Sequence, residues 1–273
     1  MRIRALVVAA TGAVALSALA VPAAQAAPAA PAGPAVTFSN MKINGGKNIV
    51  VGPTSKVTVS ATYTVTKPAA LKASSFITGP GLYRGATVDP DSNQKILSGD
   101  NEGTCTAVAG SSTVLKCKAT IQLRPKPNDV NEQLTNADAG TWKIAAIAVD
   151  TTTFGFTTQG NLGTTKVQRQ SKLTTDATPE PVKKGKTITV TGKLSRANWD
   201  TYKFAGYSTQ PVKLQFKKTG ATAWSTVKTI KTSSTGALKT TVKASADGYF
   251  RYVFAGTTTT PAVNSAADFI DVK

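Results

Sequence analysis

The chain has 273 residues, with 32 Lys and Arg against 14 Asp and Glu and a formal net charge of +18. It contains no histidine, which excludes histidine-based catalytic triads, histidine general bases and histidine metal ligands together. Carboxylates are sparse as well, so the composition favours a binding or structural protein over an enzyme.

The N-terminal residues have the features of a secretory signal peptide. Two arginines precede an apolar run over residues 5–21, and a proline and several small residues follow it. We expect cleavage between Ala26 and Ala27; the alternative, an N-terminal membrane anchor, fits less well because the run is short and alanine-rich. The mature protein is expected to be secreted, extracellular or cell-wall-associated, and without a membrane segment.

The mature chain is expected to begin with an Ala/Pro-rich tail over residues 27–35 and to continue as two domains, 36–170 and 171–273. No helical periodicity follows the signal, whereas short apolar–polar alternations recur. "KVTVSATYTVT" from Lys56 and "KTITVTGKLSR" from Lys186 each follow a turn rich in glycine, proline and lysine. The pattern predicts an all-β chain of two similar domains.

A repeated corner motif supports this duplication. "NADAGTWKIAAIAVD" in the first half and "SADGYFRYVFAG" in the second both lead from an acidic residue and a glycine into an aromatic, Trp142 or Phe250. Immunoglobulin-like sandwiches have a similar corner before a central strand. The predicted fold is therefore all-β, two tandem immunoglobulin-like β-sandwiches after a cleaved signal peptide.

The second half has the strand number of such a sandwich. Alternation breaks within Trp224–Thr232, where Val227 and Ile230 fall on opposite faces, which predicts an edge strand or a bulge. The seven expected strands lie near residues 173–177, 186–195, 212–218, 224–232, 238–244, 249–254 and 269–272.

The same segments carry a resemblance to a known group of proteins. "LTTDATPEPVKKGKTITVTGKLSRANWD", "AGYSTQPVKLQFKK" and "KTSSTGALKTTVKASADGYFRYVFAGT" resemble a module of secreted streptomycete proteins, and "NADAGTWKIAAIAVD" resembles the module that precedes it. The resemblance implies secretion and tandem immunoglobulin-like modules. It implies no catalytic residue, because the group is largely uncharacterised.

The two cysteines, Cys105 and Cys117, flank a predicted hairpin. Pairing Val108 with Val114 across its tip places Cys105 opposite Cys117, close enough for a disulfide. A metal or redox pair would need further ligands or a CxxC spacing, and the sequence has neither.

The lysines have two interpretations. Most alternate with threonine on the expected outer faces of strands, where they keep sheets soluble and block edge pairing. The same charge would attract anionic or polysaccharide cell-wall polymers. Specific nucleic-acid binding is not expected, because arginine is scarce and no recognition module is present.

The loop "SRANWDTYKFAGYSTQ" is the candidate binding site. It combines rings with hydrogen-bonding and charged groups, as sugar recognition requires. The alternative is that the rings close the end of the sandwich core. The candidate residues are Arg196, Trp199, Tyr202, Phe204 and Tyr207.

A weaker candidate is a calcium loop in "DPDSNQKILSGD". Asp89, Asp91, Asn93 and Asp100 fall at positions one, three, five and twelve, as calcium ligands do. Gln94 stands where the sharp turn needs glycine, so the alternative is an acidic turn without metal. No other cofactor is expected.

We interpret the chain as a secreted, non-enzymatic interaction module for anionic or carbohydrate wall polymers. Two alternatives stay open at this point. The first is a passive structural secreted protein, and the second is a calcium-binding extracellular protein.

Overall fold

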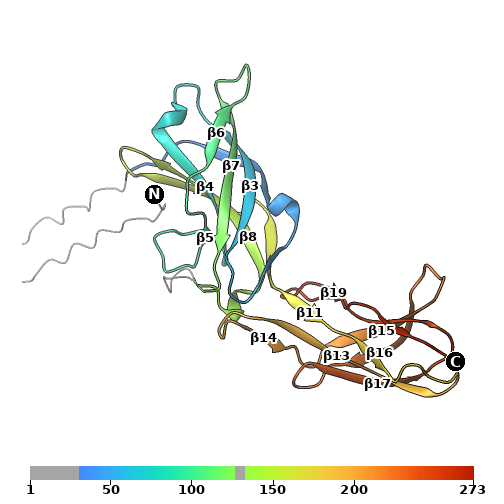
Figure 1. Cartoon of the computed structure of the whole chain (residues 1–273). Coiled ribbons are helices and arrows are strands. Elements are labelled where there is room, and N and C mark those ends of the chain that lie inside the picture. Colours follow the sequence, from blue (N-terminus) through green and yellow to red (C-terminus); the bar gives the residue numbers. More distant parts are fainter. Residues whose placement is uncertain (1–30, 127–132) are drawn as a thin grey trace, which may run out of the picture. The chain divides into compact units, whose positions relative to one another are not determined.

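The computed structural model describes residues 31–126 and 133–273, which form strands joined by turns and short 3-10 segments (Figure 1). The predicted signal peptide, its cleavage site between Ala26 and Ala27, and residues 27–30 of the tail lie outside the described residues. Within the described ranges, no helix has the length and apolarity needed to cross a membrane.

The strands of the first half build two facing sheets. One has the order β1-β3-β7-β6, and the other has the order β2-β10-β8-β4-β5, with β9 beside β8. Lettered along the chain, these orders are A-B-E-D and A′-G-F-C-C′, an immunoglobulin-like arrangement. The strands are β1 Thr37–Ile43, β2 Ile49–Val51, β3 Val57–Thr66, β4 Phe76–Tyr83, β5 Leu97–Ser98, β6 Thr104–Ala107, β7 Val114–Leu123, β8 Gly140–Asp150, β9 Phe156–Gln159 and β10 Thr164–Arg169.

The second half repeats the architecture of two facing sheets. Around β13 lie β11, β12, β14 and β17, and the facing sheet has the order β16-β15-β18-β19 with β20 also on β18. These are the A-B-E and C′-C-F-G sheets of an immunoglobulin-like sandwich. The strands are β11 Ser171–Leu173, β12 Asp176–Thr178, β13 Thr187–Asn198, β14 Lys203–Gly206, β15 Pro211–Lys218, β16 Ser225–Lys231, β17 Ala237–Lys243, β18 Gly248–Phe254, β19 Val263–Asn264 and β20 Asp268–Ile270.

The alternation in the sequence decides which side chains form the cores. In β18, Phe250, Tyr252 and Phe254 are buried, while Tyr249 and Arg251 between them stay partly exposed. In β3, the apolar residues Val59, Ala61, Tyr63 and Val65 are buried in the same way. The predicted all-β fold of tandem immunoglobulin-like sandwiches is confirmed by these sheets.

The acidic residues of the two corner motifs make different hydrogen bonds. Asp138 is buried, and its carboxylate accepts hydrogen bonds from the backbone N (2.7 Å) and the hydroxyl (3.1 Å) of Thr135. Asp247 instead accepts a bond from the backbone N of Val272 at 2.8 Å. Both carboxylates fix the chain just before a central strand, β8 or β18.

The sequence-based strand positions of the second half need small corrections. The strand expected over residues 173–177 is two strands, β11 and β12, and β14 and β19 were not expected. The irregularity expected in residues 224–232 is confirmed, since the β15–β16 register shifts between Leu214 and Gln215.

The predicted hairpin disulfide is confirmed. Cys105 on β6 and Cys117 on β7 are direct partners in the ladder, with their Cα atoms 4.1 Å apart. The bond joins neighbouring strands of one sheet and does not cross between sheets. Closing a loop of this size stabilises the fold by about 3 kcal/mol.

The chain divides into two compact units. Among the described residues, unit 1 consists of residues 31–47, Thr58–Gln122 and Trp142–Thr164, and unit 2 consists of Asn48–Val57, residues 123–126 and 133–141, and Thr165–Lys273. Unit 2 thus includes the segments around β2 and before β8 together with the second sandwich. The boundary expected between residues 170 and 171 stays a prediction.

The buried Tyr252 makes stability sensitive to high pH. Its hydroxyl donates to the carbonyl oxygen of Val190 at 2.9 Å, and burial raises its pKa from 10.0 to about 12. The hydroxyl of Tyr252 ionises at lower pH in the unfolded chain than in the folded chain. Its contribution to the free energy of unfolding is therefore complete below pH 10 and is lost as pH rises towards 12.

We therefore predict that the free energy of unfolding falls less between pH 10 and 12 in Tyr252→Phe than in the wild type. The measurement is the free energy of unfolding in urea at a series of pH values. Parallel profiles for the two proteins would contradict the prediction.

Candidate functional site

The predicted aromatic loop is the hairpin between β13 and β14. Asn198 pairs with Lys203, so Trp199 to Tyr202 form the turn. The side chain of Asn198 accepts hydrogen bonds from the backbone N of Asp200 (3.0 Å) and of Thr201 (3.2 Å). These local bonds hold the turn independently of its rings.

Trp199 is fully buried in unit 2. Its Nε1 donates to the carbonyl oxygens of Gly52 (3.0 Å) and Val51 (3.4 Å), and its backbone N donates to Oδ1 of Asn136 at 3.0 Å. A large ring with one satisfied donor is stable in this position. Its placement in the binding set is therefore corrected, because the ring exposes no face to a ligand.

A second group of bonds anchors the turn to the Leu123–Thr141 segment of the same unit. The carboxylate of Asp200 accepts from the backbone N of Asn136 at 2.9 Å, and Nδ2 of Asn136 donates to Oδ1 of Asn198 at 2.8 Å. Gln133 donates to the hydroxyl of Tyr202 at 2.6 Å. Sequence reasoning missed Asn136, since no local pattern marks a partner more than 60 residues away.

The other three rings of the loop are partly exposed, and a basic side chain lies over each of them. Arg196 lies over Tyr207 (3.8 Å from Cζ to the centroid), Lys172 over Phe204 (4.0 Å from Nζ) and Lys126 over Tyr202 (5.5 Å). Cation–π contacts are worth about 0.5–1 kcal/mol at exposed sites. Each partly exposed ring of the loop thus has a basic partner, Arg196 from the loop itself and Lys172 and Lys126 from other segments.

Arg169, which the sequence did not single out, adds a second guanidinium at this end of the sandwich. Its Nε donates to the carbonyl oxygen of Ala197 at 2.6 Å, while Arg196 donates to the hydroxyl of Thr260 at 3.3 Å. The pKa of Arg169 is lowered to about 10, mainly by burial and in part by the charge of Arg196, whereas Asp200 and Tyr207 act in the opposite direction. Burial also lowers the pKa of Arg196. Chemically, the pair could attract an anionic group.

The proposed calcium loop is closed by its own side chains. Asp89 accepts from the backbone N of Asp91 at 3.1 Å, while Gln94 accepts from the backbone N of Asp89 (3.1 Å) and donates to the carbonyl oxygen of Arg84 (2.7 Å). In the described ranges, no cluster of three or more acidic, histidine or cysteine side chains is arranged for a metal. Calcium binding through Asp89, Asp91, Asn93 and Asp100 stays a prediction.

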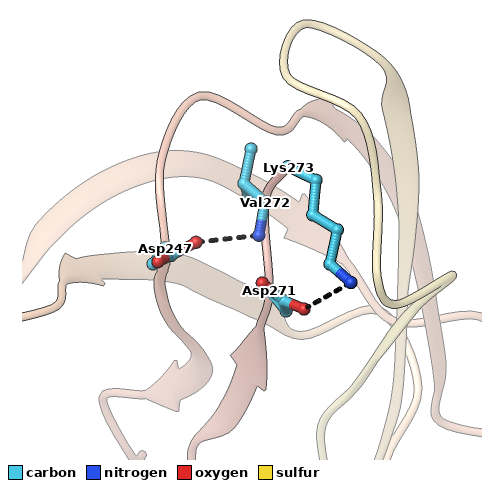
Figure 2. A network of polar contacts seen from close by, with 4 residues as sticks. All are labelled: Asp247, Asp271, Val272 and Lys273. Carbon is cyan, nitrogen blue, oxygen red and sulfur yellow. Dashed lines mark hydrogen bonds and ion pairs between the residues drawn. The ribbon is translucent and has the colours of Figure 1, made fainter.

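An open hollow of about 420 Å³ lies in unit 2, lined by Lys184, Lys218 and Lys273 among others. Three of its lining residues are drawn in Figure 2, where the carboxylate of Asp247 accepts a hydrogen bond from the backbone N of Val272 and Lys273 pairs with Asp271 at 3.8 Å. Both partners of that ion pair are well exposed, so the pair contributes little to stability.

No protein-family model matches the chain, and no curated protein matches its sequence. Among solved structures, a chimeric titin Z1Z2-Z1Z2 tandem is 12% identical, with 87% of this chain and 99% of that chain covered and a TM-score of 0.29. Fibronectin(III)-like modules of CbhA from Clostridium thermocellum are 11% identical, with 87% and 92% covered and a TM-score of 0.29. The D00-D0 domain of intimin is 14% identical, with 86% and 99% covered and a TM-score of 0.27. These scores are low, and the fold assignment depends on the strand orders.

The buried position of Trp199 yields a stability prediction. Trp199→Phe removes the donor to the carbonyl oxygen of Gly52 and leaves a gap, so we expect a loss of about 2 kcal/mol in the free energy of unfolding. The matched control is Trp224→Phe, because that ring is partly exposed and its indole N–H has no hydrogen-bond partner in the part of the chain that the structure describes. Urea unfolding measures both, and equal losses would contradict the structural role of Trp199.

Proposed function

We propose that this protein is a secreted, non-enzymatic interaction module that holds anionic carbohydrate polymers of a bacterial cell wall. The charge supports the proposal, because only +2 of the net +18 lies in the expected signal peptide, as Arg2 and Arg4, and the strongly basic remainder concentrates polyanions near the surface. The signal-like N-terminus supports an extracellular destination.

The observation that carries the proposal is the pairing of basic groups with rings. In unit 2, Lys172, Arg196, Lys217 and Arg251 each lie over an aromatic ring. None of the four has an ion-pairing carboxylate in the described part of the chain. A positive charge beside an apolar ring suits an acidic sugar, whose C–H face and carboxylate it can contact together.

The competing function is a passive structural protein whose lysines only keep the sheets soluble. The two functions predict different effects of salt on binding to the polymer. A binding module loses affinity steeply as salt rises, because salt competes for the contacts with the polymer. A passive protein is not retained at any salt concentration.

The test is co-sedimentation of the mature chain with purified bacterial walls, both intact and stripped of anionic polymers. We predict retention on intact walls at low salt, release at high salt, and weaker retention on stripped walls. Absence of retention at low salt would overturn the proposal. Retention that neither salt nor stripping changes would also overturn its electrostatic basis.

A further inference from the structure

A row of large side chains crosses the outer face of one sheet in the second sandwich. Phe269 on β20 is the ladder partner of Tyr249 on β18, which is in turn the partner of Lys217 on β15. Trp224 directly precedes Ser225, the first residue of β16 and the partner of Phe216. We call Phe269, Tyr249, Lys217 and Trp224 the ring row.

The members of the ring row lie in contact with one another. The rings of Tyr249 and Phe269 have centroids 5.2 Å apart and are tilted by 55°. The Nζ of Lys217 is 5.3 Å from the ring centroid of Trp224 and 5.6 Å from that of Tyr249. The row is therefore continuous from β20 across β18 and β15 to the residue just before β16, with one cation between rings.

Arg251 adds a second cation beside the row. It is the ladder partner of Gln215, whose Oε1 accepts a bond from its Nε at 2.9 Å, and its guanidinium lies 4.0 Å from the ring centroid of Trp224. Its remaining N–H donors have no protein partner within the ranges that the structure describes. They are available to an anionic group next to the ring.

These rings are not needed by the core. Phe250 and Tyr252 alternate with Tyr249 and Arg251 along β18 and already fill the inner face. Phe269 is 38% exposed, and Tyr249 and Trp224 are partly exposed. Apolar side chains that gather on an outer face are typical of surfaces that bind a partner or a ligand.

We propose that the ring row with Arg251 is a binding site for an acidic polysaccharide, an inference that rests on the proposed function and locates its site. Adjacent strands lie about 4.8 Å apart, close to the length of one sugar residue, so a chain laid across the strands meets successive groups of the row. Its C–H faces pack on the rings, and its carboxylates pair with Lys217 and Arg251.

Single-stranded nucleic acid fits this surface less well. Bases stack on open, successive ring faces. Here Arg251 already covers one face of Trp224, and the tilt between Tyr249 and Phe269 prevents them from forming one flat platform.

The test uses the mature chain and three probes: polygalacturonate, its methyl ester and a single-stranded oligonucleotide. We expect Trp224→Ala and Phe269→Ala each to weaken polygalacturonate binding about tenfold. Arg251→Gln should weaken polygalacturonate binding similarly and leave any binding of the ester unchanged. Titration calorimetry gives the Kd values, and melting curves check that each variant is folded.

Two control variants match these changes elsewhere on the surface. Phe154→Ala removes a ring that is 74% exposed in unit 1, and Lys239→Gln removes an exposed charge on β17 of the opposite sheet. We expect both to bind polygalacturonate within about twofold of the wild type, since neither touches the row.

The outcomes separate the two proposals. A wild type that binds polygalacturonate, with row variants no weaker than the controls, overturns the ring row but leaves the proposed function standing. A wild type that binds no acidic polymer even at low salt contradicts both. Equal binding of the methyl ester, or tighter binding of the oligonucleotide, overturns the assignment of an acidic polysaccharide as the ligand.

Discussion

The alternation of side chains between the two faces of each strand is the constraint on which the rest of this structure depends. It sends the aromatic residues of β18 into the core and its intervening residues outward. It also confines the surplus of lysine to outer faces, because a charge on the inner face would be buried without a partner. The cores therefore leave most of the lysines exposed to solvent, within reach of a polymer.

The aromatic residues depart in two opposite ways from the usual rule that rings in strands face the core and rings in loops are exposed. Trp199 lies in a loop, where rings are often displayed, yet it is fully buried and hydrogen-bonded to the chain around Gly52. Tyr249 and Phe269 lie in strands, where rings usually face the core, yet they lie on the outer face. The loop thus serves mainly as an anchor, and the sheet offers the more continuous surface.

What the sequence could predict follows from the range of the interactions. Strand alternation and the hairpin disulfide are local, so residues such as Val59, Phe250 and the Cys105–Cys117 pair could be placed without a structure. The burial of Trp199 depends on Gly52, 147 positions away, and no local pattern reports it. The ring row was missed for the same reason, because its members come from separate segments and meet only through the ladder register.

The most direct test of this account is a map of where an acidic polysaccharide contacts the protein. Backbone amide chemical shifts of the isotope-labelled mature chain would be followed during titration with short oligogalacturonates. The account predicts that the largest changes cluster around Lys217, Trp224, Tyr249, Arg251 and Phe269. Changes spread evenly over the exposed lysines of both sheets would contradict it, since the charge would then act only as a diffuse field.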